Sequence, residues 1–201
     1  MIFRFAYIKE RDMEKKLFLP IGIDDFKKVK DDCYYIDKTL FLEDIIHSAK
    51  STTFLFTRPR RFGKSLMLSM CKYFFDANED NEYLFKDTNI LKSSNEFKAY
   101  MHKYNIIHLN FKGMTSNSFD ELLQSISLKI SELYIDLLDG YKSKEEKYIK
   151  TIIERSPTLA ELKISLYKLS RFLYLKNKLE VIILIDEYDS PLENAYTKGY
   201  Y

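Results

Sequence analysis

The chain has 201 residues, enough for one large domain, and its 46% hydrophobic content is typical of a globular protein. Lysine and arginine number 32 against 30 acidic residues, so the net charge of +2 does not by itself argue for nucleic-acid binding. Two cysteines exclude a disulfide framework. The longest aliphatic run, Val181 to Ile185, is far shorter than the ~20 residues of a membrane span. Without an apolar leader, the sequence predicts a cytoplasmic protein with no membrane partner.

The first third of the chain predicts an extension followed by short elements. Residues 1–16 are interpreted as an N-terminal extension. Residues 38–49 carry apolar side chains at helical spacing, with Asp37 as a candidate N-cap. TTFLFT, residues 52–57, is β-branched and aromatic and predicts a strand. SLMLSMCKYFFD, residues 65–76, predicts a buried helix with its cysteine in the core.

The middle of the chain predicts a second strand and a long helix. Residues 77–104 are polar and indicate irregular structure, with a short helix over 94–102. IIHLNF, residues 106–111, predicts the second strand. A helix is predicted over 118–138, because a capping box of the type Ser-x-x-Glu opens it and its apolar residues form one stripe.

The last third predicts one more helix and a third strand. Residues 139–156 are charged and indicate a solvated segment, and a second capping box opens a predicted helix over 158–174. EVIILI, residues 180–185, predicts a strand buried on both faces, as in a parallel sheet. Strands that alternate with helices predict an α/β fold with three layers.

A candidate phosphate-binding loop joins the first predicted strand to the next helix. Such loops offer phosphate their backbone N–H groups and the positive end of a helix dipole. Gly63, Lys64 and Ser65 lie at this junction. Lysine at this position reaches the β and γ phosphates, and serine holds Mg²⁺. The usual pattern has glycine five positions before Gly63, where this chain has Arg58.

The third predicted strand ends in two acidic residues, Asp186 and Glu187. Ligands bind at the carboxyl edge of open α/β sheets, so both acids are expected at the ligand site. We expect Asp186 to hold the Mg²⁺ shell and Glu187 to polarise the attacking water as general base. Asp189 either orients Glu187 or an arginine, or is a turn residue before Pro191.

Alternative interpretations remain for the arginine-rich loop before Gly63 and for the function of the whole chain. Arg58, Arg60 and Arg61 are expected to bind the nucleotide or pair with acids, and a nucleic-acid-binding patch is the alternative. The loop and the acidic strand end together predict a P-loop NTPase, with a non-hydrolysing nucleotide switch as the alternative. The three histidines have no ligand-like spacing and are interpreted as structural.

Two strings in combination resemble a known family. TRPRRFGKS after an apolar strand, and LIDEYDSP followed by GYY, look like the predicted AAA-ATPase-like domain of bacterial proteins. The upstream LPIGIDDFKKVKDDCYYIDKTLFL is similar to that family's N-terminal signature, so the resemblance covers residues 17–201. Arg58 is normal in that family. The resemblance implies a P-loop NTPase with a three-layer α/β/α fold, a mainly parallel sheet, and ATP with Mg²⁺ as cofactors.

The resemblance also implies roles for individual residues. Lys64, Ser65, Asp186 and Glu187 match functional positions of the family, with Lys64 and Glu187 catalytic and Ser65 and Asp186 on the metal. The residues expected to bind the nucleotide are Arg60, Arg61, Phe62, Gly63, Lys64, Ser65 and Leu66.

The family resemblance further predicts an incomplete domain. Family members continue into a further segment and a nuclease-like domain, so nucleic acid is expected as a partner only through such a domain. Only 15 residues follow Asp186, so the family's strand between 52–57 and 181–185, its polar sensor and its lid are expected to be missing. We therefore expect residues 17–201 to be a truncated ATPase-like domain. It would bind ATP and hydrolyse it only with its missing half or other subunits.

Overall fold

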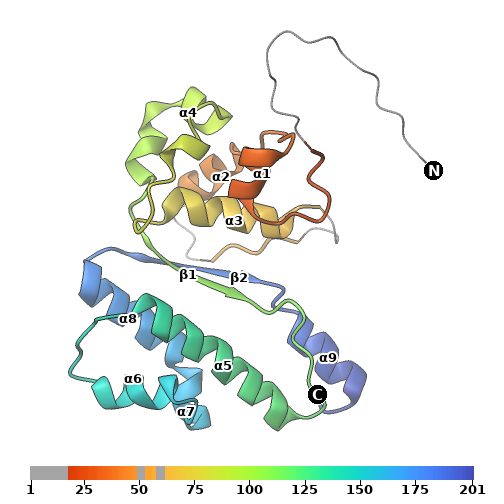
Figure 1. Ribbon diagram of the computed structural model, residues 1–201, viewed down its shortest axis with the longest axis vertical. Coiled ribbons are helices and arrows are strands. Elements are labelled where there is room, and N and C mark those ends of the chain that lie inside the picture. Colours follow the sequence, from red (N-terminus) through yellow and green to blue (C-terminus); the bar gives the residue numbers. More distant parts are fainter. Residues whose placement is uncertain (1–17, 49–52, 58–61) are drawn as a thin grey trace.

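The structure is a computed structural model that describes residues 18–48, 53–57 and 62–201. A two-stranded parallel sheet lies between two groups of helices, so the described chain has three layers (Figure 1). This arrangement confirms the α/β class predicted from the alternation of strands and helices. In the described residues, no helix combines the length and the apolar character needed to cross a membrane.

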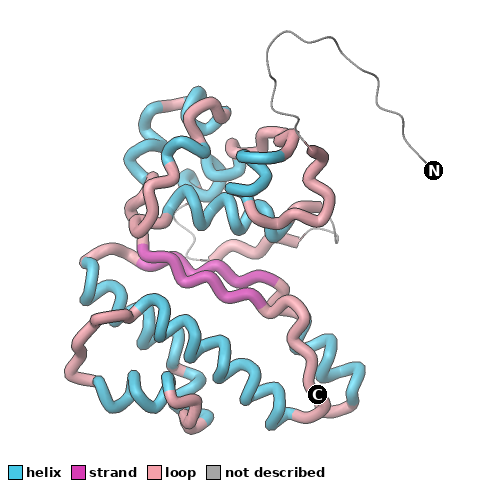
Figure 2. Tube along the Cα trace, in the orientation of Figure 1, coloured by secondary structure: helices cyan, strands magenta, loops and turns pink. Residues whose placement is uncertain are grey.

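The sheet consists of β1 (Asn105–Asn110) and β2 (Val181–Asp186), which lie side by side (Figure 2). Successive side chains of a strand point to opposite faces of the sheet. Ile106 therefore packs in one hydrophobic cluster and its neighbour Ile107 in the other. Both strands lie within one residue of the segments predicted from the sequence.

The first half of the chain covers one face of the sheet. Its core contains Phe26, Met70, Phe74 and Phe85 together with Leu184 of β2. The elements on this face are α1 (Phe26–Asp32), α2 (Phe41–His47), α3 (Lys64–Phe75), the 3-10 helix η1 (Glu82–Leu84), α4 (Asn89–Ser93) and the 3-10 helix η2 (Asn95–Tyr100).

The second half covers the other face. Tyr134 is fully buried there, and its hydroxyl donates to the Ser165 carbonyl at 2.7 Å, which ties two helices together. The elements of this half are α5 (Phe119–Leu137), α6 (Glu146–Ile153), α7 (Leu159–Lys163), α8 (Ser165–Asn177) and, after β2, α9 (Ser190–Lys198).

Helix α3 runs antiparallel to the strands. The N–H of His102 donates to the Phe74 carbonyl and that of Tyr104 to the Phe75 carbonyl, both at 3.0 Å, so α3 ends where β1 begins. A 12-residue helix rises about 18 Å, and a six-residue strand about 20 Å. The first turn of α3 therefore lies at the carboxyl edge of the sheet, as the run of colours along α3 also shows (Figure 1).

The prediction of a strand over 52–57 is wrong for residues 53–57, which the structure describes. Residues 53–57 form no strand, and the described sheet contains β1 and β2 alone. Phe56 packs its ring edge-on against Phe41, with 4.7 Å between ring centroids. β-branched and aromatic residues favour strands only where a neighbouring strand supplies hydrogen bonds and packing.

Two further expectations about burial and structure are wrong. Strand β2 is not buried on both faces, because Ile183 and Ile185 remain 41% and 40% exposed. The charged segment 139–156 contains α6, which buries Ile149 and Ile152 against α5 and α8. The many charges of that segment occupy the outer side of a short amphipathic helix.

The helix predicted over 38–49 is the shorter α2, and the N-cap predicted at Asp37 is wrong, because Leu40 precedes the helix and Asp37 accepts the Thr39 N–H at 2.8 Å. The other predicted helices lie near their expected positions. Helix α3 lies one residue from its predicted bounds and buries Cys71, and α5 begins after Ser118 as predicted. The predicted helix over 158–174 has its capping box at Thr158 but is divided into α7 and α8 at Ile164. The helix predicted over 94–102 is the 3-10 helix η2, with α4 before it.

Candidate functional site

The start of α3 is a helix end built around a glycine. Gly63 precedes the helix with φ of 74° and ψ of 27°, a left-handed conformation that glycine adopts without strain. No described side chain caps this end. The first N–H groups of any helix lack partners within the helix, and they carry its partial positive charge. The start of α3 thus offers unpaired donors for an anion at the carboxyl edge of the sheet.

The sequence-predicted residues of this loop are only partly within the described chain. Arg58, Arg60 and Arg61 lie outside the described residues. Lys64 and Ser65 occupy the first turn of α3 and are half-buried, as is Leu66. Phe62 is exposed beside them.

Asp186, the last residue of β2, is a buried carboxylate at the same edge. Its side chain is 4% exposed. Its Oδ1 accepts the Glu187 N–H at 3.0 Å, and its Oδ2 accepts the Asn110 amide at 3.5 Å. A carboxylate has about four acceptor positions, so these two donors leave capacity for a cation.

Glu187 follows with a backbone conformation that is rare for its residue type. Its φ is 52°, and the left-handed region costs a non-glycine residue about 1–2 kcal/mol. Ser190 holds this turn, because its N–H donates to the Glu187 carbonyl at 3.1 Å and its hydroxyl to Oε2 at 3.4 Å. Strained residues cluster at functional sites, where the surrounding structure fixes them. Asp189 lies at the start of α9, and its carbonyl accepts the Glu193 N–H at 2.9 Å.

Sequence reasoning missed two residues at this edge, Asn110 and Lys112. Lys112 pairs with Asp24 at 2.8 Å. This contact raises the pKa of Lys112, with smaller contributions from the charges of Asp186 and Glu187, and it lowers the pKa of Asp24. Asn110 is the last residue of β1, and Lys112 follows it by two residues. No local pattern in the sequence marks either residue, because both depend on the pairing of β1 with β2.

His108 lies on the same face of β1 as Asn110, two residues earlier. Its Nε2 is buried and has no hydrogen-bond partner within the described structure. Burial lowers the pKa of His108, and the nearby Lys72 charge lowers it further. The imidazole is therefore neutral at pH 7 and adds no positive charge to the site.

Comparison with models of known protein families identifies the family of this chain. The family model described as predicted AAA-ATPase matches residues 20–201, nearly the whole chain and every described residue of the candidate site. The chain belongs to the predicted AAA-ATPase family. This finding confirms the resemblance carried by the two sequence strings.

A curated relative extends the comparison without adding a function. The chain is 29% identical over 184 residues to the uncharacterized protein in the vnfD 5′ region of Azotobacter chroococcum mcd 1. That match covers 90% of this chain and 30% of the relative, so the chain spans under a third of the relative's length. No solved structure matches this predicted AAA-ATPase.

The donor set of this predicted AAA-ATPase suits one kind of metal ion. The described residues contain no cluster of three or more histidine, cysteine or acidic side chains able to bind a metal. Mg²⁺ does not require such a cluster, because it keeps several waters and binds through one or two protein oxygens plus substrate phosphates. The Ser65 hydroxyl and the Asp186 carboxylate, on elements that meet at one sheet edge, fit this type of binding.

Proposed function

We propose that this chain is the ATP-binding module of an ATPase and that Mg-ATP binds between the start of α3 and the end of β2. One observation carries the proposal. The uncapped, glycine-led start of a 12-residue helix lies at the sheet edge where β2 ends in a buried aspartate. Helix starts attract phosphate, and ligands of α/β sheets bind at this edge. The family name, predicted AAA-ATPase, supports the same conclusion.

Each residue has a distinct role in the proposed site. Lys64 neutralises the β and γ phosphates, while Ser65 and Asp186 hold Mg²⁺. The metal, when bound with the nucleotide, polarises the phosphate oxygens. The residues proposed to contact the nucleotide are Arg60, Arg61, Phe62, Gly63, Lys64, Ser65 and Leu66.

Glu187 is the proposed general base for hydrolysis. Its carboxylate takes a proton from a water whose oxygen attacks the γ-phosphorus, and the bond from the γ-phosphorus to the bridging oxygen breaks to release ADP and phosphate. The αL turn at Glu187 and the contact with Ser190 fix where this carboxylate lies.

Calorimetry with Mg-ATP tests the proposal. Wild type is compared with Lys64→Ala and with Lys163→Ala, which removes an equally charged but exposed lysine on α7. We expect Lys64→Ala to weaken binding at least tenfold and Lys163→Ala to leave it unchanged. Equal affinity in all three proteins, or no binding in wild type, contradicts the proposal. Circular dichroism of each variant shows whether it is folded.

A further inference from the structure

Helix α8 presents an exposed stripe in which aromatic and cationic side chains alternate. One face of α8 is buried in the hydrophobic core that it shares with α5 and β1. Residues spaced three and four apart share one side of a helix. The exposed side of α8 and its C-cap carry four residues at intervals of four, three and four, which we call the α8 stripe: Tyr167, Arg171, Tyr174 and Lys178.

The two tyrosine rings of the stripe are open to a ligand. Tyr167 is 70% exposed and Tyr174 is 50% exposed. The Lys178 ammonium lies 6.0 Å from the centre of the Tyr174 ring, so a cation already sits beside this ring. A solvated helix face is normally charged or polar. Large rings that alternate with cations on such a face indicate a surface that binds a ligand with both aromatic and anionic groups.

The stripe belongs to a basic region that the net charge of the whole chain conceals. Residues 142–178, which include α6, α7 and α8, contain ten lysines and arginines against four acidic residues, whereas the whole chain has 32 against 30. Helix α8 has three basic residues and no acidic one, while the neighbouring α5 has four acidic residues and one lysine. The positive charge is therefore local to this region, where it attracts anions.

Some cations of this region hold the fold together, and the cations of the stripe remain available to a ligand. Lys168 forms an ion pair with Glu145, and Lys176 donates to two backbone carbonyls at the end of α5, each at 3.1 Å. Arg171 donates to Glu145 at 3.2 Å. A guanidinium has five N–H donors, so this bond leaves donors on Arg171 for a second anion.

We propose that the α8 stripe binds single-stranded nucleic acid, with bases stacked on Tyr167 and Tyr174 and phosphates paired with Arg171 and Lys178. Stacking on aromatic side chains beside a cationic track is the usual way in which proteins bind single strands without regard to sequence. Seven residues of helix separate the two rings by about 10.5 Å, about three times the 3.4 Å spacing of stacked bases. DNA and RNA present the same phosphates and base faces to such a surface.

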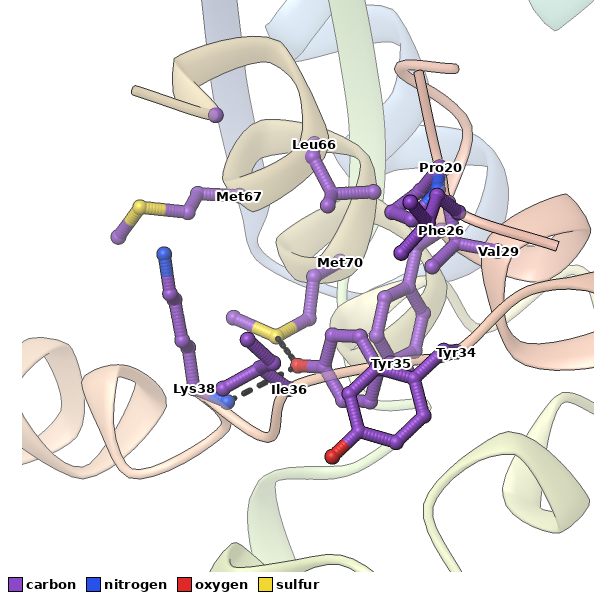
Figure 3. A pocket seen from close by; sticks show the side chains of 12 residues that line it. Pro20, Phe26, Val29, Tyr34, Tyr35, Ile36, Lys38, Leu66, Met67 and Met70 are labelled. Carbon is purple, nitrogen blue, oxygen red and sulfur yellow. Dashed lines mark hydrogen bonds between the residues drawn. The ribbon is translucent and has the colours of Figure 1, made fainter. Parts of the chain in front are cut away.

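The stripe is separate from the proposed Mg-ATP site. Figure 1 shows α8 and α3 on opposite sides of the sheet, and the two helices pack in different hydrophobic clusters. The apolar cavity of about 200 Å³ beside Gly63, between α3 and the first described segment, also lies on the α3 side (Figure 3). The proposal is therefore independent of the proposed function, and either can fail without the other.

Fluorescence anisotropy with a labelled 12-nucleotide oligothymidylate tests the proposal on the 201-residue chain. Wild type should bind the strand with a dissociation constant of about 1–100 µM, the range of sequence-independent binding. It should bind the duplex of this strand with its complement at least fivefold more weakly, because pairing hides the base faces. Tyr167→Ala and Tyr174→Ala should each weaken single-strand binding about fivefold or more. Tyr196→Ala is the control, because it removes an exposed tyrosine on α9.

A salt titration tests the cationic half of the stripe. The logarithm of the affinity for a single strand falls with the logarithm of the salt concentration, with a slope of about −0.7 for each neutralised phosphate. Lys178→Gln should therefore make this slope shallower by about 0.7. Lys198→Gln, which removes an exposed lysine on α9, should leave the slope unchanged. Equal slopes in wild type and Lys178→Gln contradict a phosphate contact at Lys178.

Several results would overturn the proposal. They include unchanged affinity in both tyrosine variants, a duplex bound as tightly as the single strand, and no binding of either by wild type. A loss of binding in Arg61→Ala, with the tyrosine variants unaffected, would place nucleic acid on the arginine-rich loop instead. Binding to vesicles of phosphatidylserine and phosphatidylcholine without binding to the oligonucleotide would replace the nucleic acid with a membrane surface. Circular dichroism shows whether each variant is folded.

Discussion

Asn110 and Asp186 lie opposite each other in the last pair of the parallel sheet, and the Asn110 amide donates to Asp186 Oδ2 at 3.5 Å. The amide is held in this orientation because its Oδ1 accepts the Lys112 N–H at 2.7 Å. The polar end of β1 thus positions the carboxylate at the end of β2. In the proposed site, the pairing of the two strands therefore sets the position of the carboxylate that binds Mg²⁺.

Replacing Asn110 should affect the metal-dependent part of nucleotide binding. Asn110→Ala removes one of two described donors to Asp186, and we expect the affinity for Mg-ATP to fall about three- to tenfold. Binding of ATP in the presence of EDTA should not change. Calorimetry with and without Mg²⁺ measures both, with Asn95→Ala on η2 as the exposed control. An equal loss with and without Mg²⁺ would contradict a role through Asp186.

Comparing Gly63→Ala with Gly140→Ala separates the effect of backbone strain on stability from the role of Gly63 in nucleotide binding. Gly63 and Gly140 have φ of +74° and +66°, and a Cβ at either position meets no atom within 4 Å. Alanine at either site should lower the free energy of unfolding by about 1–2 kcal/mol, because the left-handed backbone strains an L-residue. Only Gly63→Ala should weaken Mg-ATP binding. Urea unfolding and calorimetry check the pair, and equal nucleotide affinity in both variants would refute the special role of Gly63.

Glu187→Gln should separate hydrolysis from binding. The amide keeps the size of the side chain but cannot take a proton, so we expect turnover to fall about 10²–10⁴-fold. The affinity for Mg-ATP should stay within about twofold. Phosphate release measures turnover and calorimetry measures affinity, each in wild type and in the variant. Unchanged turnover would favour the non-hydrolysing nucleotide switch.

The buried thiol of Cys71 should make stability depend on alkaline pH. Burial raises the pKa of Cys71 from 9.0 to about 12. A pKa that is higher in the folded state contributes stability below pH 9, and this stability is lost as pH rises towards 12. Cys71→Ala should therefore make the fall of unfolding free energy shallower by up to about 1.4 kcal/mol per pH unit.

Urea unfolding at several pH values between 9 and 12 checks this expectation. Leu68→Ala on the same helix is the control, because it removes packing without removing a titrating group. A slope in Cys71→Ala that equals the wild-type slope would show that the thiol does not titrate differently in the folded and unfolded states.

Local patterns in the sequence predict the elements that a long apolar run or a capping residue marks directly. Helix α3 is mostly apolar, strand β2 is an uninterrupted aliphatic run that ends in Asp186, and the Ser118 and Thr158 caps mark helix starts. Residues 52–57 show the opposite case, because a strand also depends on a partner that a local pattern does not identify. Helix α6 escaped prediction because its charges hide a short apolar stripe.

The candidate site likewise has some features that a local sequence pattern marks and others that depend on the fold. The positions of Lys64 and Ser65 at a helix start, and of Asp186 and Glu187 at a strand end, could be predicted from the sequence, and the roles of these residues stay predictions. Asn110 could not, because its role comes from its register opposite Asp186. The cavity beside Gly63 also could not, since it forms only when the segment around Tyr34 packs on α3.

A double-mutant cycle on Ser65 and Asp186 tests the central claim, that α3 and β2 bind one Mg-ATP between them. Calorimetry measures Mg-ATP affinity in wild type, Ser65→Ala, Asp186→Asn and the double variant. If both residues hold the same Mg²⁺, the double variant should lose little more affinity than the more damaging single change, because the losses are not additive. Losses that add fully, or an unchanged affinity in either single variant, would contradict a shared metal site.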